Sequence, residues 1–401
     1  MSNKNKATAL LLAVLVTAPF AQAQDTQDPE EQNPVTGEDF DYLQARVDDL
    51  AGQLDAARPG KRKFLVTGYA FGGFENFEGE NSSFSGGFNP IFLWSPTERV
   101  FFEGELELEL EGDETESGLE YAQLSYVLSD SAILGVGKFL NPANVFQNRL
   151  HPAWINKLPD RPLVFGSRRL QASTQLGAQL HGGVRVGNTK MNYVVYASNG
   201  PSLEAEDEAS FGTLGFNNFE DSNNSKALGA RVGVFVVPAL EVGYSIEQSS
   251  NVTAEELGVE DADALIQSVD LNYVGNIAGG TVDCRFQWVF SDVDDVVFDP
   301  DASGGFGPLS LDNKRDGGYA QIAYRPSVSD TSTLGKLEGV LRYDAVNLPS
   351  GAPEGADESR VTIGVNFWSS ASSVFKVAYQ AADPEGSAST DGIMFQWALG
   401  F

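Results

Sequence analysis

Hydrophobic and polar residues alternate with a period of two along most of the chain from residue 61 onward, which is typical of β-strands. Near the end of the chain, Ile393, Phe395, Trp397 and Leu399 alternate with small or polar residues. The alternation predicts about 16 strands. Their expected ranges are 64–76, 83–94, 98–110, 117–128, 131–140, 174–186, 189–198, 226–237, 239–249, 264–275, 278–290, 316–326, 334–345, 359–368, 372–381 and 391–401.

The connections between these segments alternate between short and long. Ser129-Asp130 and Gly187-Asn188 are tight, whereas 141–173 and 199–225 are long. A barrel with both termini at one end has short turns at that end and longer loops at the other, whereas a β-sandwich has no reason to sort its loops in this way. The alternation of short and long connections therefore predicts an all-β fold, a transmembrane antiparallel β-barrel over residues 61–401.

The alternation also predicts which face of each strand meets lipid. Val361 and Ile363 share one face of their segment, and Thr362 and Asn366 share the other. This predicts a barrel that is apolar outside and polar inside, the inverse of a soluble β-domain. No apolar run after residue 23 is long enough for a transmembrane helix, so strands have to make any membrane span. The aromatic girdle at one interface is expected to contain Phe92, Trp94, Phe367, Trp368, Trp397 and Phe401.

The first 60 residues follow a different pattern. Residues 1–23 combine lysines, an apolar run and a small-residue cleavage site, which predicts a secretory signal peptide. Residues 24–37 are acidic and contain proline, which predicts a disordered leader. Residues 38–58 have apolar residues at the a and d positions of a short coiled coil. This helix fits two interpretations, a short oligomer stalk or an amphipathic helix packed on the mouth of its own barrel.

The formal net charge of the chain is −30, yet one segment is strongly basic. The long connection 141–173 and the strand before it contain one acid, Asp160, against Lys138, Arg149, Lys157, Arg161, Arg168 and Arg169. A strand nearby carries acids at every second position, namely Glu103, Glu105, Glu107, Glu109 and Glu111. If these acids face the lumen, the two sets of charges either tether the loop to the wall or line a narrow passage with opposed charges.

The sequence offers little for catalysis or metal binding. One cysteine, Cys284, excludes an intrachain disulfide, and no nucleophile motif accompanies His151 or His181. The acidic stretch 291–301 supplies oxygens for a divalent cation but lacks the spacing of a calcium loop, which favours solvated charge. We therefore expect no enzymatic activity, no cofactor, no metal site and no nucleic-acid partner.

These features resemble bacterial outer-membrane porins, closest to the phosphate-selective porin O/P group and related trimeric porins. The resemblance rests on the heptad segment, the strands KFLVTGYAFGGFE and FFEGELELELEG, the segment GVGKFLNPANVFQNRLHPAWINKLPD and the terminal WALGF. It implies that the loop 141–173 folds inward as a constriction, that Phe401 is recognised by the barrel assembly machinery, and that the chain forms a homotrimer. Acidic outer loops and mixed lumen charges depart from the phosphate-selective pattern.

The sequence thus predicts a porin in the outer membrane of a Gram-negative bacterium, through which small hydrophilic solutes or ions diffuse passively. The loop cations predict a modest anion preference, and outer-membrane lipid and lipopolysaccharide are the expected surroundings. The alternative is a surface receptor or structural protein whose lumen is closed by the loop 141–173.

Overall fold

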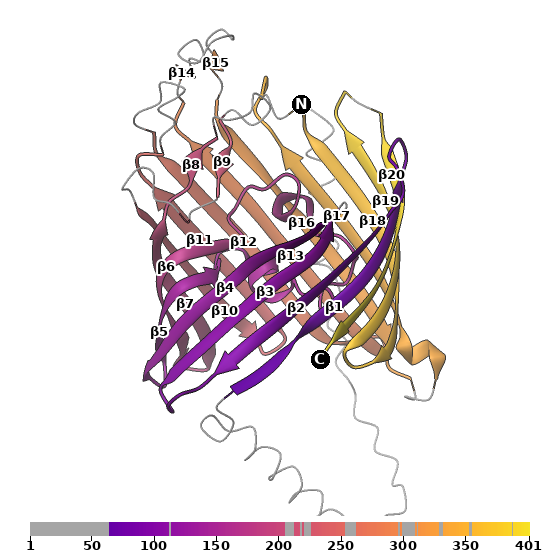
Figure 1. Ribbon diagram of the computed structural model, residues 1–401, viewed down its shortest axis with the longest axis horizontal. Coiled ribbons are helices and arrows are strands. Elements are labelled where there is room, and N and C mark those ends of the chain that lie inside the picture. The colour runs from indigo at the N-terminus through magenta and orange to yellow at the C-terminus, as the bar shows by residue number, and fades with distance from the viewer. Residues whose placement is uncertain are drawn as a thin grey trace, which may run out of the picture. The chain divides into compact units, whose positions relative to one another are not determined.

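The structure is a computed structural model in which residues 64–111, 114–204, 212–216, 219, 226–252, 262–295, 297–298, 309–310, 312–328, 332–352, 355–386 and 388–401 are described. The expected signal peptide, leader and heptad helix, residues 1–58, lie outside this part of the chain. The described residues form one closed β-barrel (Figure 1). None of their helices is long and apolar enough to cross a membrane.

Sixteen strands follow one another around the barrel in sequence order, each antiparallel to its neighbours. They are β1 Phe64–Phe77, β2 Ser83–Trp94, β3 Val100–Glu111, β4 Glu114–Ser129, β5 Ala132–Leu140, β6 Thr174–Val186, β7 Thr189–Asn199, β10 Lys226–Val237, β11 Leu240–Ser249, β12 Ala264–Ile277, β13 Gly280–Val293, β16 Lys314–Pro326, β17 Leu337–Asn347, β18 Glu358–Ser370, β19 Ser373–Pro384 and β20 Thr390–Gly400. Pairing of β1 with β20 closes the barrel. The predicted fold class and strand number are confirmed.

Other elements lie in the connections. Two short ribbons, β8 Ser202–Leu203 with β9 Leu214–Gly215 and β14 Val297–Phe298 with β15 Leu309–Ser310, stand apart from the barrel sheet. The segment expected to be a strand from residue 334 starts as a 3₁₀ helix, η5 Thr333–Lys336, because Ser332 caps it by accepting a hydrogen bond from the amide of Leu334.

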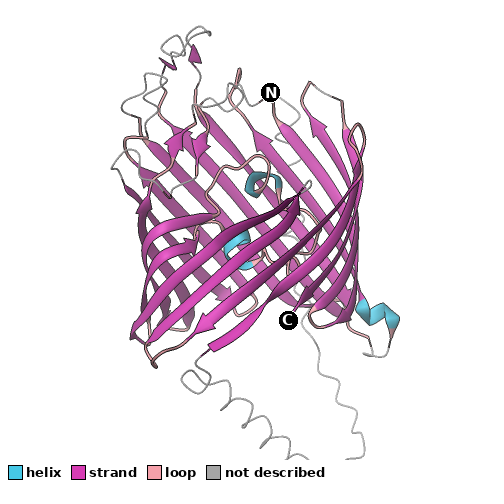
Figure 2. Cartoon of the chain, viewed as in Figure 1, coloured by secondary structure: helices cyan, strands magenta, loops and turns pink. Residues whose placement is uncertain are grey.

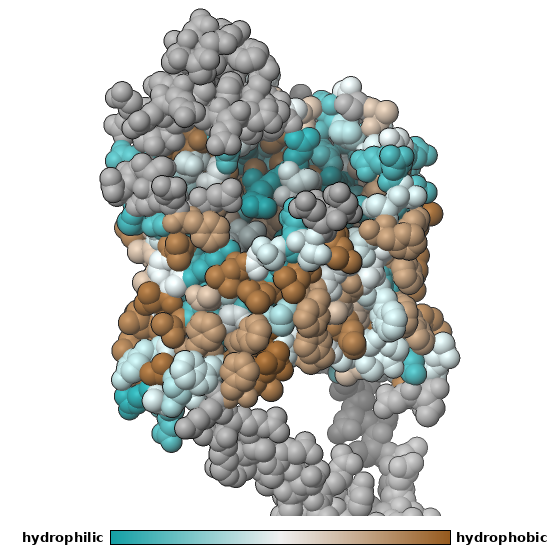
Figure 3. Space-filling model, in the orientation of Figure 1, coloured by the Kyte–Doolittle hydropathy of each residue, from teal (hydrophilic) through white to brown (hydrophobic). Residues whose placement is uncertain are grey.

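The outer face of the barrel is apolar, as the alternation predicted. On β18, Ile363 is 56% exposed and Val365 is 52% exposed, whereas Thr362 and Asn366 are fully buried inside. Figure 3 shows hydrophobic residues gathered over the middle of the barrel wall. One expected girdle residue is an exception. Trp368 is only 9% exposed, because it lies on the same inner face as Asn366, and its indole donates to Glu338 at 3.0 Å.

The connection 141–173 enters the barrel and carries two short helices, α3 Val145–Arg149 and η1 Leu163–Phe165 (Figure 2). Its apolar side chains build the hydrophobic core there. One cluster combines Phe146, Leu163, Val164, Phe165 and Leu170 of the loop with Ile266, Val289, Tyr319 and Val346 of the wall. In a second cluster, Leu158 packs against Ala323, Val340, Ala378 and Met394. These clusters fix the position of the loop across the lumen.

Candidate functional site

Helix α3 is held by hydrogen bonds at its first turn. Asn144 caps the helix, and its side chain accepts from the amide of Gln147 at 3.0 Å. The side chain of Gln287 on β13 accepts from the amide of Val145 at 3.1 Å and donates to the carbonyl of Ala143 at 2.8 Å. A single wall residue thus satisfies both an orphan donor and an acceptor where the loop begins.

Four of the loop cations expected from the sequence form ion pairs with carboxylates on different strands of the wall. The pairs are Arg149 with Glu241 on β11 at 2.7 Å, Lys157 with Glu338 on β17 at 2.8 Å, Arg161 with Glu107 on β3 at 3.4 Å, and Arg168 with Glu358 on β18 at 3.4 Å. Because these strands lie on several sides of the barrel, the pairs fasten the loop around the lumen.

In each of these pairs the cation is more exposed than its carboxylate. The side-chain exposure is 39% for Arg149 against 6% for Glu241, and 28% for Arg168 against 9% for Glu358. A fifth cation, Arg169, is exposed and forms no ion pair within the described residues. In each loop–wall pair the positive partner is therefore the one more accessible to solvent.

The acidic strand β3 faces this loop, but its glutamates have different surroundings. Glu103 accepts from Gln123 at 3.3 Å, Glu107 pairs with Arg161, and Glu105 is 1% exposed. Glu107 and Glu109 both line the same cavity against the loop.

A β-bulge adds another acid to this wall. The register between β3 and β4 shifts after Glu105, and the extra residue, Glu120, accepts a hydrogen bond from the side chain of Gln147 in the loop. The sequence alternation did not reveal Glu120, because a bulge breaks the period of two that places a side chain on one face.

Lys138 does not join the other cations. It lies in β5 on the same face as Leu134 and Val136, both exposed on the outside of the barrel. Its ammonium donates to the carbonyl of Leu119 at 2.5 Å and lies 4.6 Å from the ring centroid of Phe219. The structure therefore places Lys138 on the outer face and away from the lumen.

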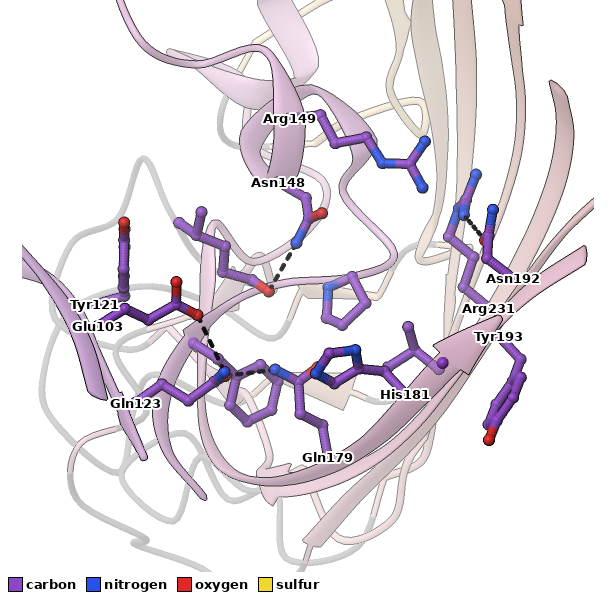
Figure 4. Close-up of a pocket in the computed structure, with 15 residues that line it drawn as sticks. Glu103, Tyr121, Gln123, Asn148, Arg149, Gln179, His181, Asn192, Tyr193 and Arg231 are labelled. Atoms are coloured by element: carbon purple, nitrogen blue, oxygen red, sulfur yellow. Dashed lines mark hydrogen bonds between the residues drawn. The ribbon is translucent and has the colours of Figure 1, made fainter. Parts of the chain in front are cut away.

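Polar cavities lie along both sides of the loop. Toward the short turns, a cavity of about 460 Å³ is lined by Arg149, Glu103, Gln123, His181 and Arg231, among others (Figure 4). Toward the long loops, a cavity of about 380 Å³ is lined by residues that include Arg168, Arg169 and Arg315. A third, of about 390 Å³, separates Arg161 from the wall around Glu109. No group of three or more His, Cys, Asp or Glu side chains among the described residues is arranged to hold a metal ion.

One cluster of buried charges on the wall includes a carboxylate from the loop. Arg342 on β17 is fully buried, donates to Asp344 at 2.7 Å and also pairs with Asp160 of the loop. Asp344 in turn accepts from the amide of Leu163 at 3.1 Å. Both charged partners are needed, because a buried ion without its counter-charge is strongly unfavourable.

Phe401 lies where the barrel closes. Its amide donates to the carbonyl of Gly68 at 3.0 Å, and the amide of Gly68 donates back at 3.2 Å. The ring stacks on Phe88 with centroids 5.6 Å apart. Only glycine fits at position 68, since its φ is +150° and a Cβ atom would lie 2.2 Å from the carbonyl oxygen of Asn89.

Comparison with known proteins places this barrel among solved outer-membrane structures. No protein-family model matches the sequence, and no curated protein matches it significantly. The anion-selective porin from Comamonas acidovorans superposes with a TM-score of 0.53 at 11% identity, over 84% of this chain and 99% of that chain. The fold is that of outer-membrane porins.

Two further solved structures agree on this fold. The trimer form of OmpT, an outer-membrane protein of Vibrio cholerae, has a TM-score of 0.50 at 13% identity and is covered over 99% of its length by 84% of this chain. The outer-membrane channel DcaP of Acinetobacter baumannii has a TM-score of 0.50 at 11% identity, over 84% of this chain and 97% of that chain. Membership of the phosphate-selective O/P group stays a prediction from the sequence.

Proposed function

We propose that the protein is a channel in the outer membrane of a Gram-negative bacterium, through which small hydrophilic solutes and ions diffuse. The observation that carries this proposal is a closed barrel with an apolar outside and charged cavities on both sides of an inward loop. In lipid every backbone polar group has to be paired within the protein, and a closed barrel achieves this while leaving its interior polar.

We infer that the loop 141–173 is the constriction of this channel. The passage then runs along the cavity between the loop at Arg161 and the wall at Glu109, where Arg161 itself pairs with Glu107. Opposed charges across a narrow passage create a transverse field that orients polar solutes.

We also propose a modest anion preference. The paired carboxylates are the less exposed partners, so a passing ion meets mainly guanidinium and ammonium groups on the loop side. Arg169 adds a positive charge that forms no ion pair within the described residues. The acids of β3 oppose this preference and keep it small.

A homotrimer with lipid and lipopolysaccharide around it is the assembly we propose. The broad apolar outer face supports a membrane setting, and the similar OmpT barrel is known in a trimer form. The position of Phe401 at the closing seam fits a role for the last residue in recognition by the barrel assembly machinery.

The second candidate is a receptor or structural protein with a closed lumen, and the dense packing of the loop favours it. Leu158, Leu163 and Val164 are fully buried against the wall, so the loop fills much of the barrel cross-section. The two candidates differ in whether water and ions pass the loop.

Conductance of the purified, heat-modifiable protein in planar lipid bilayers tests the proposal. We expect stepwise current increases in potassium chloride and a reversal potential of anion-preferring sign in a salt gradient. Correctly folded protein that never conducts would support the closed-lumen candidate, above all if deletion of the loop then opens a conducting pore.

A further inference from the structure

A cavity of about 320 Å³ between the loop and the wall combines aromatic rings with polar groups. The loop contributes Trp154 and Ile155, and the wall contributes Tyr319 and Gln321 of β16 and Trp368 of β18. The volume lies at the lower end of the range for small-molecule sites, which are mostly apolar and carry a few well-placed polar groups. The cavity therefore has the size and the lining of a site for one small solute.

The aromatic side chains of this cavity are held in place by their neighbours. The ring of Tyr319 meets the rings of Phe146 and Phe165 edge-on, with centroids 6.1 Å apart in each case. Trp154 rests on the backbone of Gly400, where a Cβ atom would lie 2.7 Å from the indole. A ligand would thus meet a surface that is already formed, which lowers the entropic cost of binding.

Three polar groups at the cavity are left without a hydrogen-bond partner among the described residues. Gln321 is 8% exposed and Tyr319 is 2% exposed, yet neither the amide of Gln321 nor the hydroxyl of Tyr319 is bonded to any residue of the described chain. The same holds for the indole nitrogen of Trp154. Buried polar groups are nearly always hydrogen-bonded, so these three are available to water or to a solute. The amide and the hydroxyl can donate and accept, and the indole nitrogen donates.

The charged side chains at the cavity are already paired with one another or with their neighbours. Arg285 donates to Asp283 through Nε at 2.5 Å and through Nη2 at 3.0 Å, and its Nη1 donates to Asn272 at 3.1 Å. Lys157 pairs with Glu338 at 2.8 Å. An anion or a cation would have to compete with these pairs, whereas an uncharged solute leaves them intact. The cavity therefore favours a neutral ligand.

We propose that this cavity binds the ring of a neutral monosaccharide. The hydroxyl groups of a sugar both donate and accept, which suits the unbonded groups of Gln321 and Tyr319. Its C–H groups pack on the electron-rich faces of aromatic rings, such as the partly exposed indole of Trp154. A purely apolar solute would leave the buried amide and hydroxyl unpaired, which is unfavourable. A sugar ring satisfies the polar and the apolar part of the lining together.

The cavity lies on the side of the loop toward the short turns. Trp368 is close to the end of β18 at Ser370, next to the short turn that leads to β19. A sugar in the lumen at that end of the barrel would reach the site directly. A role of the site in sugar passage rests on the proposed channel function, but sugar binding itself does not.

Saturation-transfer NMR of the full protein in lipid nanodiscs measures sugar binding without any conductance. Glucose, galactose and mannose are the probes, and empty nanodiscs give the background. We expect saturable binding of at least one of these sugars. For the sugar that binds most tightly, the 6-phosphate and the 6-amino-6-deoxy derivative keep the ring but add a negative or a positive charge. Both derivatives should bind more weakly than the neutral sugar, because the charges at the cavity are already paired.

Two variants test the lining of the cavity. Gln321→Leu removes the amide and keeps a side chain of similar size, so binding should weaken about two- to tenfold, the range for one hydrogen bond between uncharged groups. Trp154→Leu removes the aromatic face and should weaken binding by a similar factor. Gln179→Leu and Trp94→Leu are the matched controls, because Gln179 borders a different cavity and Trp94 is exposed on the outer face. Neither control should change the affinity.

The outcomes separate the site from the channel. Absence of saturable binding by all three sugars would overturn the proposal and show that water alone fills the cavity. Tighter binding of either charged derivative would overturn it in favour of an ion site, and unchanged affinity in Gln321→Leu or Trp154→Leu would overturn the assignment to this cavity. Heat-modifiable migration identifies folded variants, and one folded variant is enough for the test. Absence of conductance would instead overturn the channel function and leave the binding result standing.

Discussion

Removal of Arg342 should release the middle of the loop from the wall. The guanidinium of Arg342 is fully buried and pairs with Asp344 of its own strand and with Asp160 of the loop. Gln380 also donates to Asp160 at 2.9 Å. In Arg342→Met the two carboxylates lose their guanidinium partner, and Asp344 stays buried beside the loop.

The size of the effect follows from burial. Loss of one partner from a buried ion pair costs about 3–5 kcal/mol, because the remaining charge is uncompensated. That range corresponds to a shift of roughly 100-fold to several thousand-fold toward the undocked loop. The barrel should survive, since its strands are held by their own hydrogen bonds, which the loop does not supply. In Arg342→Met with Asp344→Asn, the buried charge is gone but an acceptor for the amide of Leu163 remains, so docking should recover in part.

Hydrogen exchange of residues 158–170 reports this docking, and urea unfolding reports the barrel. We expect much faster exchange in Arg342→Met, slower exchange in the double variant, and little change in the unfolding midpoint. Arg185→Met is the control, because that side chain is exposed at the end of β6. Exchange in Arg342→Met equal to that of the wild type, or a double variant less protected than the single one, would show that the ion pairs do not hold the loop.

Three further predictions concern selectivity, assembly and the N-terminal helix. Arg169→Gln should lower the anion preference by less than about fourfold, because the Coulomb energy of about 0.8 kcal/mol at about 5 Å in water is reduced further by screening at 0.1 M salt. Arg99→Gln should leave the reversal potential unchanged, and the opposite pattern would refute the constriction assignment. Deletion of Phe401 should reduce the amount of folded, heat-modifiable protein in the outer membrane, because the seam with β1 loses two hydrogen bonds, and normal assembly would contradict this. Charges at Val47 and Leu50 should abolish self-association of a peptide of the heptad segment in sedimentation experiments, and a wild-type peptide that stays monomeric would exclude the stalk.

Strand alternation and loop lengths determined much of this fold from the sequence alone. A period of two is a local property of a few residues, so it predicted the strands, their number and the apolar outer face. It also contained the information that Lys138 points outward with Leu134 and Val136, although its position next to the basic loop suggested the lumen. The same alternation on β18 placed Trp368 inside with Asn366.

Only the tertiary structure decided which charges meet. Arg149 and Glu241 are 92 residues apart, and Lys157 and Glu338 are 181 apart, because barrel closure brings distant strands around the loop. The loop sequence has no regular alternation of polar and apolar residues, so it does not show which strand of the wall each cation contacts.

The environment of each acid on β3 also depends on long-range packing. The alternation gave Glu103, Glu105 and Glu107 the same face, but only Glu105 lies under His151 and loses contact with water. The burial of an atom depends on all the residues that pack around it, so it cannot be predicted from the sequence of one strand. The bulge that brings Glu120 into the lumen has the same origin, since it depends on how two strands pair and on what the loop offers them.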